Sequence, residues 1–192
     1  MPNPIDDAEI HEIVQKVVRS ALGSSQRESM SAAPAPQVVT SDKKVVAIGA
    51  DHGGFELKEA LKPELKTLGF EINDVGTHSK DAVDYPDFAH AVAQSVSSGK
   101  AWRGIMIDGA GIGSCIVANK VPGVRAGMVY DYSSAVNSRE HNDTNVLTLG
   151  AGLIGITLAK QIVKTWLTTE FAGGRHTPRL DKLKSVEKKY LK

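Results

Sequence analysis

Two glycine-rich segments combine an acidic residue with small neighbours, a combination that suits the binding of an anion. They are residues 49–54 (GADHGG) and residues 108–114 (DGAGIGS). Glycines allow backbone N–H groups to approach an anion closely, and a helix that follows points its positive end at the same place. Each segment therefore offers an anion-binding turn beside a titratable side chain.

Two further segments carry imidazole and guanidinium groups. Residues 138–145 (SREHNDTN) supply His141, an imidazole that could transfer protons near neutral pH. Residues 173–179 (GGRHTPR) supply two guanidiniums and a second imidazole, which suits a local phosphate site. Taken alone, His141 could merely cap a helix and the arginines could form a solvated surface. Four such segments in one small domain favour a functional site.

The glycines of residues 108–114 also raise the alternative of a dinucleotide site. GAGIG begins like the G-x-G-x-x-G fingerprint, and Asp131 lies about twenty residues further on, near the spacing of a ribose-binding acid. However, the third glycine comes one place early, and Ser114 occupies the required position. Nicotinamide binding therefore stays the less favoured alternative.

Length and composition limit the classes of protein to which the chain could belong. Its 192 residues suffice for one α/β domain of ordinary size plus an appendage. Its 23 basic and 22 acidic residues give a formal net charge of +1, which creates no general field to attract nucleic acid or an anionic membrane. No apolar run approaches the ~20 residues of a membrane-spanning helix, and the N-terminus lacks the pattern of a secretory signal. Because the single cysteine, Cys115, allows no internal disulfide, we expect a cytoplasmic protein.

From residue 44 onward, strand-like and helix-like patterns alternate. The segments that read as buried strands are 45–50, 70–76, 104–109, 124–130 and 145–150, and the clearest helices are 56–68, 87–97, 133–140 and 154–168. This alternation predicts an α/β fold in which a parallel sheet is covered by helices on both faces. Ligands of such folds bind at the carboxyl ends of the strands, so the residues just after each strand are the ones to consider.

The first 43 residues have a different character. Apolar residues recur at three- and four-residue spacing from Ile10 to Leu22, which predicts a short amphipathic helix within residues 1–23. Residues 24–43 are rich in Ser, Ala, Pro and Gln and read as a flexible linker, which leaves residues 44–192 as the folded domain. The helix could fold back onto that domain. It also resembles the encapsulation peptides that deliver enzymes into bacterial microcompartments, which implies shell proteins or other tagged cargo as partners.

The order of motifs in the folded part resembles one family closely. GADHGGFELK, DYPDFA, DGAGIGSCIVANKVPGVRA, SREHNDTNVLTLG and GGRHTPR follow one another as in ribose-5-phosphate isomerase type B and the related galactose-6-phosphate isomerase subunits. The resemblance covers roughly residues 44 to 190. It implies a Rossmann-like, three-layer α/β/α fold with a five-stranded parallel sheet. It also implies a homodimer or tetramer with sites between subunits, and neither a metal nor an organic cofactor.

By the same resemblance, the reaction interconverts an aldose phosphate and its 2-ketose phosphate through a cis-enediolate. His141 and Asp51 would assist ring opening, and Asn142 would hold a substrate hydroxyl. Tyr85 would line the pocket, and the backbone N–H groups of residues 109–113 would face the enediolate oxygen. The remaining expected substrate contacts are the phosphate-binding residues His52, Arg175, His176 and Arg179, and the loop residues Gly109, Ala110, Gly111 and Gly113.

The sequence departs from this family at four positions. Asp108 stands where many members have a cysteine base and Ala110 where they have threonine, while Ser114 replaces the glutamate base of other members. Asp108 is then the only obvious base for the C2 proton, although it could instead organise its loop. We expect Cys115 to be packed against the sheet rather than reactive. The fourth departure is Gly152, where relatives usually have a phosphate-binding arginine, and this puts the identity of the sugar in doubt.

Three functions are therefore compatible with the sequence. The first is an isomerase of ribose 5-phosphate and ribulose 5-phosphate. The second is an isomerase of a different sugar phosphate, either a deoxy sugar or a longer one such as a hexose. The third is a catalytically silent sugar-phosphate-binding or shell-associated protein. The sequence favours the first, because Asp51, His52, His141, Asn142 and both arginines of residues 173–179 are retained.

Overall fold

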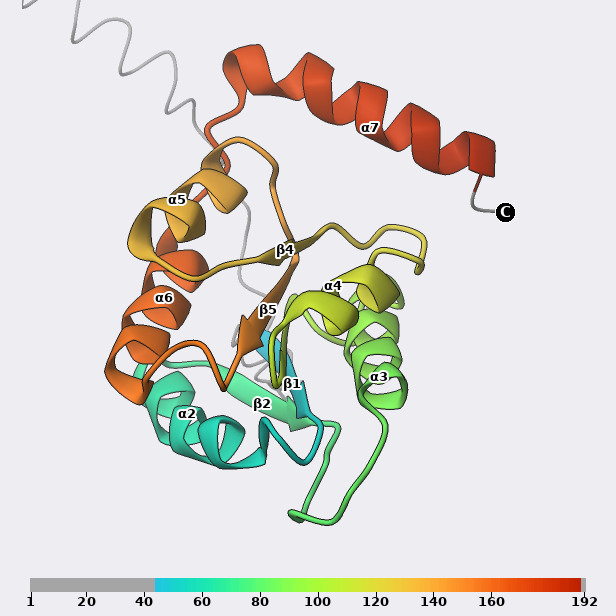
Figure 1. Ribbon diagram of the computed structural model, residues 1–192. Helices are drawn as coiled ribbons and strands as arrows, with labels where there is room; N and C mark the ends of the chain where they lie inside the picture. Colours follow the sequence, from blue (N-terminus) through green and yellow to red (C-terminus); the bar gives the residue numbers. More distant parts are fainter. Residues whose placement is uncertain (1–43, 191–192) are drawn as a thin grey trace, which may run out of the picture. The chain divides into compact units, whose positions relative to one another are not determined.

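The computed structural model describes residues 44–190 (Figure 1). The predicted tag helix and linker lie outside the described residues, so both stay predictions. None of the helices within residues 44–190 has the length and apolar character needed to cross a bilayer.

The described part contains one five-stranded sheet whose neighbouring strands are all parallel. The strand order is β2-β1-β3-β5-β4, and the strands are β1 (Val45–Ala50), β2 (Glu71–Asp74), β3 (Arg103–Asp108), β4 (Ala126–Met128) and β5 (Val146–Gly150). Strands β3 and β5 are buried throughout, and β1 is buried apart from its first residue, as expected for a parallel sheet covered on both faces. The predicted five-stranded α/β fold is confirmed.

Helices cover both faces of the sheet. They are α2 (Phe55–Thr67), α3 (Tyr85–Ser97), α4 (Ile112–Ala118), α5 (Tyr132–Glu140), α6 (Ile156–Thr168) and α7 (Thr177–Tyr190), with a short 3₁₀ turn, η1 (Gly174–His176), before α7. Helices α2, α5 and α6 pack on one face and α3 and α4 on the other. Helix α7 extends beyond the layers in Figure 1, and of its residues only Leu180 is buried.

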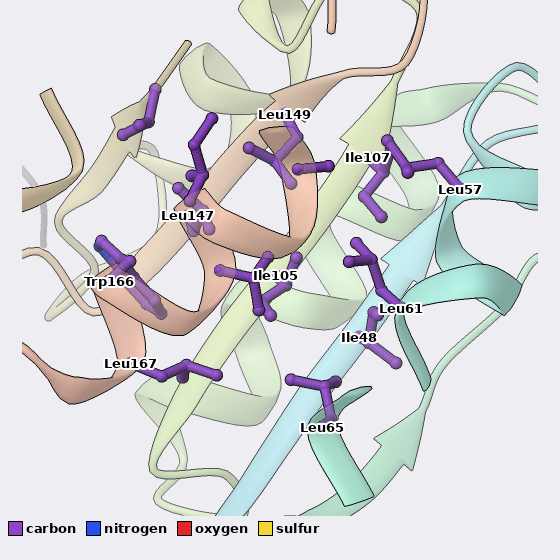
Figure 2. Packing of buried hydrophobic residues seen from close by; sticks show 14 of the residues in the cluster. Ile48, Leu57, Leu61, Leu65, Ile105, Ile107, Leu147, Leu149, Trp166 and Leu167 are labelled. Atoms are coloured by element: carbon purple, nitrogen blue, oxygen red, sulfur yellow. The ribbon is translucent and has the colours of Figure 1, made fainter. Parts of the chain in front are cut away.

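The larger core lies under α2 and α6 (Figure 2). Alternate strand residues, such as Ile48, Ile105 and Leu147, point into it and meet Leu61 and Trp166.

The opposite face of the sheet is built from smaller residues, which let α3 approach closely. A Cβ atom on Gly104 would lie 2.6 Å from Val92 of α3, and one on Gly49 would lie 2.8 Å from the same side chain. These two strand positions therefore require glycine.

The elements differ from the sequence expectations in a few places. Helix α3 begins two residues earlier than predicted, with Pro86 in its first turn, and α6 begins two residues later, after the N-cap Gly155. The predicted fourth strand shortens to three residues. Helix α7 follows α6 and was not among the predicted helices, because its polar, lysine-rich composition concealed it.

Candidate functional site

The two acidic glycine turns meet at the carboxyl edge of the sheet. Strands β1 and β3 are neighbours, and Asp51 follows the first while Asp108 ends the second. A Cβ atom on Gly53 would lie 3.3 Å from Asp51 Oδ1 and 3.7 Å from Gly109 N, so the two turns are in contact. This is the point where the chain order reverses across the sheet, the usual ligand position in such folds.

Asp108 is buried, and both of its carboxylate oxygens accept hydrogen bonds. Oδ1 accepts from the N–H groups of Ala110 (2.9 Å) and Gly111, and Oδ2 accepts from the N–H (3.2 Å) and the hydroxyl (2.5 Å) of Ser114. Two of the departures from the family pattern, at positions 108 and 114, are thus in direct contact. The hydrogen bonds show that Asp108 organises the loop. They do not decide whether it is also the base, which stays a prediction.

Only some of the backbone N–H groups of this loop donate to Asp108. Those of Ala110 and Gly111 point at Asp108, so they are not free to face an enediolate oxygen as expected from the sequence. Ile112 and Gly113 are the first two residues of α4, and such residues have no carbonyl partner within their helix. Within residues 44–190, the oxyanion donors that this loop can still offer are the N–H groups of Gly109, Ile112 and Gly113.

Tyr130 is a contact of this loop that the sequence analysis missed. Its hydroxyl lies 2.9 Å from the carbonyl oxygen of Ala110 and 2.8 Å from Met128 Sδ, so its single proton serves one of them. No motif marked Tyr130, because only the folded chain brings the end of β4 against the loop after β3.

The other expected residues of the carboxyl edge lie around the two turns. Asp51 is buried and accepts a hydrogen bond from the N–H of Gly54 (2.9 Å). His52 is exposed, and its Nδ1 contacts the backbone of Val83. Tyr85 begins α3, and its ring lies 2.6 Å from where a Cβ atom on Gly113 would be, so only glycine fits beneath it.

The histidines and arginines of the other two motifs form a second cluster. His141 is the C-cap of α5, and its ring stacks on that of His176 with 4.1 Å between centroids and 10° between planes. Together with Asn142 and Arg179, they line a cavity of about 260 Å³. Within residues 44–190, neither Arg175 nor Arg179 takes part in an ion pair, so both charges are available to a phosphate.

Burial and neighbouring charges act on the second imidazole of this cluster. Burial, the adjacent His141 ring and the guanidiniums of Arg175 and Arg179 lower the pKa of His176 below its ordinary value. His176 is therefore suited to be neutral near pH 7, and its expected contact with phosphate would then be a neutral hydrogen bond.

The two clusters lie at opposite edges of the sheet. Helix α5 returns from the end of β4 to the start of β5, and residues 172–176 lie beside its end, since Ala172 N donates to Glu140 O. Strand β5 spans about 16 Å at ~3.3 Å per residue. In Figure 1, the end of α5 and α7 lie at the top of the sheet and the turn after β1 at the bottom. One copy of the described domain therefore does not bring His141 next to Asp51.

Three remaining residues have structural environments that bear on the alternatives. Asp131 caps α5, and the N–H and hydroxyl of Ser134 hold its pKa below the usual range, so it is engaged elsewhere than at a ribose. Burial raises the pKa of the Cys115 thiol, whose Sγ contacts Ala126 O at 3.5 Å, in line with a packed cysteine.

Gly152 donates its N–H to Gly109 O, so the position lacking an arginine adjoins the Asp108 loop.

Within residues 44–190, no three His, Cys, Asp or Glu side chains converge as a metal ion would require. The expectation that no cofactor is needed stays a prediction.

Comparisons with known proteins agree with this architecture. The family model described as Ribose/Galactose Isomerase matches residues 46–183. Ribose-5-phosphate isomerase B of Escherichia coli is 43% identical over 76% of this chain and 98% of its own length. D-erythrulose-4-phosphate isomerase of Pectobacterium atrosepticum is 42% identical over 72% and 91% of the two chains. The solved structure of Clostridium thermocellum ribose-5-phosphate isomerase B is 51% identical, covers 76% of this chain and 99% of that one, and superposes with a TM-score of 0.75.

Proposed function

The chain belongs to the ribose/galactose isomerase family, and from that premise we propose that it interconverts ribose 5-phosphate and ribulose 5-phosphate. The chemistry is that of an aldose-ketose isomerase. The observation that supports the proposal most is the meeting of Asp51, Asp108 and the start of α4 at the carboxyl edge of β1 and β3. Two carboxylates beside helix N–H groups that have no acceptor within residues 44–190 are the groups that an enediolate mechanism requires.

The reaction would run in three stages. In the first, Asp51 and His141 open the furanose ring by moving a proton from O1 to the ring oxygen. In the second, the Asp108 carboxylate removes the proton from C2, and the N–H groups of Ile112 and Gly113 stabilise the enediolate oxygen. In the third, the proton is returned to C1 and the O2 proton passes to O1. Arg175 and Arg179 would bind the phosphate.

The separation of the two clusters supports a site built from two copies of the chain. The His141 and Arg179 cluster of one copy would cover the Asp51 and Asp108 edge of another, in a two-fold homodimer. A groove of about 950 Å³ between α7 and β4 offers an apolar surface for this contact. Its apolar lining includes the exposed residues Met128, Leu183, Val186 and Tyr190. Burial of these side chains would stabilise the pair.

The direct test is to incubate the purified full chain with ribose 5-phosphate and follow the formation of ribulose 5-phosphate. The same assay on deoxyribose, tetrose and hexose phosphates ranks the substrates by kcat/KM. Ribose 5-phosphate should give the highest value. If only another sugar phosphate is turned over, the proposed substrate is wrong but the proposed type of reaction stands. No turnover of any sugar would support the catalytically silent alternative.

A tetrose phosphate is the second candidate substrate. Gly152 stands where an arginine would reach the phosphate, and a relative that is 42% identical is named for D-erythrulose 4-phosphate. A substrate held in a different pose fits this loss. If a pentose phosphate is the natural substrate, Gly152→Arg should raise kcat/KM for ribose 5-phosphate.

We further propose that residues 1–23 direct the enzyme into a bacterial microcompartment. The proposal rests on the apolar stripe Ile10, Ile13, Val14, Val17, Val18 and Leu22 followed by a Pro-rich linker. An isolated helix of this length is only marginally stable without a partner surface. A shell protein or another tagged cargo would provide that surface.

Removal of residues 1–43 should leave turnover and assembly unchanged but abolish recruitment to the shell. The same residues fused to a fluorescent protein should confer recruitment in a host that makes the shell, whereas Val14→Glu with Val18→Glu should prevent it. Microscopy of the fusions measures the outcome. Loss of activity or assembly on truncation would show instead that the helix belongs to the folded domain.

A further inference from the structure

Asn137 lies one helical turn before His141 on α5, and their side chains are in contact. The amide nitrogen Nδ2 of Asn137 is 2.8 Å from Nδ1 of His141. An amide NH₂ group only donates hydrogen bonds, so Nδ1 must present its lone pair. The single proton of a neutral His141 ring is then on Nε2.

The stacked His176 ring has an equivalent constraint. The guanidinium Nε–H of Arg175 lies 3.4 Å from Nε2 of His176 and donates to it, which leaves the His176 proton on Nδ1. Burial, His141, Arg175 and Arg179 lower the pKa of His176, so the stack disfavours additional positive charge. Each imidazole of the pair thus receives one hydrogen bond on one nitrogen and carries its proton on the other.

The tautomer of an imidazole decides what it can do for a substrate. A neutral ring with Nε2–H outward donates a hydrogen bond, whereas a ring with a bare Nε2 accepts a proton. At the other cluster, the Asp51 carboxylate accepts a hydrogen bond from the Gly54 N–H on Oδ1 only, as far as the described residues show. Asp51 is therefore the group with free capacity to accept a proton.

We propose that Asn137 is a positioning residue that holds His141 in the Nε2–H tautomer, so that His141 is the donor and Asp51 the base of ring opening. This rests on the proposed isomerase function. The O1 proton passes to the Asp51 carboxylate, the bond between C1 and the ring oxygen breaks, and that oxygen takes the Nε2 proton of His141. The imidazole then regains a proton from the Asp51 carboxylic acid, directly or through water, so no proton is gained or lost.

The tautomer is measured by ¹⁵N NMR of the full chain labelled in histidine, at about pH 8, above the reference pKa of the side chain. The His141 resonances are assigned by their absence from His141→Gln. We expect a protonated Nε2 and a bare Nδ1. In Asn137→Asp, whose carboxylate can only accept, the proton should move to Nδ1. Asn137→Leu should give a mixture, and Ser133→Ala, on the same helix, should leave the spectrum unchanged.

Kinetics test the consequence of the tautomer. Asn137→Asp should slow conversion of ribose 5-phosphate at least about tenfold, because the donor of ring opening is lost. It should leave unchanged the exchange of C1 hydrogens of ribulose 5-phosphate with solvent deuterium. That ketose carries its phosphate on O5, cannot close a ring on C2, and needs no ring opening.

A wild-type His141 with its proton on Nδ1 would overturn the proposal, as would an Asn137→Asp variant with unchanged tautomer and rate. The NMR measurement needs no substrate. A protein with the expected tautomer but no turnover of any sugar phosphate would therefore refute the proposed function and leave the tautomer assignment standing.

Discussion

In this chain, the two positions that carry alternative catalytic bases in the family are occupied by Asp108 and Ser114, whose side chains are hydrogen-bonded to each other. Ser114 is fully buried and donates to Oδ2 through both its N–H and its hydroxyl. A glutamate at position 114 would face this carboxylate with a like charge, so aspartate at one position favours a small donor at the other. The pair keeps the carboxylate at the end of β3 while fixing the turn that follows it.

Replacement of Asp108 by asparagine tests its role as the base. Asp108→Asn preserves the size of the side chain but removes the proton acceptor, so turnover should fall by about a hundredfold or more. Steady-state kinetics measure the loss, and thermal unfolding with phosphate binding controls for the fold. Ser114→Ala is the matched variant that removes one donor and keeps the carboxylate. Near-normal turnover of Asp108→Asn would show that Asp108 only organises its loop.

Removal of the His141 imidazole should affect ring opening far more than the later steps. In His141→Ala we expect conversion of ribose 5-phosphate to fall about a hundredfold, because proton transfer to the ring oxygen is lost. Deuterium exchange into C1 of ribulose 5-phosphate, which bypasses the ring, should change only a few-fold. Mass spectrometry of the ketose measures the exchange. Equal losses in both assays would assign His141 another role.

The candidate site residues could be chosen from the sequence, but their contacts could not. Asp51, Asp108 and His141 stood out because titratable side chains beside glycine turns or phosphate-type motifs are uncommon. Tyr130 and Asn137 did not, since an ordinary polar residue becomes significant only through the partner that the fold brings to it. The use of the Ala110 and Gly111 N–H groups by Asp108 likewise depends on a turn geometry that no residue pattern encodes.

At the scale of elements, strands and helices with a strong apolar pattern could be predicted from the sequence, whereas those with a weak pattern could not. Strands β1, β3 and β5 are buried runs of branched residues, and their positions followed directly from the sequence. Helix α7 has a weak stripe and many charges, because most of its surface is not covered by its own chain. A helix that packs against another subunit contributes few residues to the core of its own chain, so its sequence shows only a weak apolar pattern.

A charge on the exposed apolar face of α7 should separate the proposed dimer. Leu183→Glu would bury an unpaired carboxylate in the interface, so we expect monomers in light scattering and a loss of turnover with an intact fold by circular dichroism. Lys188→Glu, on the same helix but outside the groove lining, is the control that should remain dimeric. A dimeric, fully active Leu183→Glu would place the interface elsewhere.

At the scale of the whole molecule, the fold explains why the four motifs do not form one site within a single chain. In a parallel sheet, each helix carries the chain back to the amino edge, so residues after strands and residues after helices end at opposite edges. In the sequence, the four motifs are related only by their chemistry. Their separation makes the second copy part of the proposed active site.

Mixing two inactive variants tests this arrangement. If each site takes Asp108 from one chain and His141 from another, a heterodimer of Asp108→Asn and His141→Ala contains one intact site and one doubly altered site. Co-refolding equal amounts should then restore about 25% of wild-type turnover, since half the dimers are mixed and each has one working site. No recovery, with mixed dimers confirmed by native mass spectrometry, would place both residues of a site in one chain.

The chain's two tryptophans lie on the amino-edge side of the sheet, and this makes the protein an optical reporter of one half of its site. Trp166 donates its indole N–H to Thr144, which belongs to the same segment as His141, and Trp102 precedes β3 with its ring against Arg103. Within residues 44–190, no hydrogen bond or ring contact joins either tryptophan to Asp51 or Asp108. Intrinsic emission should therefore change when inorganic phosphate binds near Arg179 and stay constant when protonation changes at the carboxyl edge.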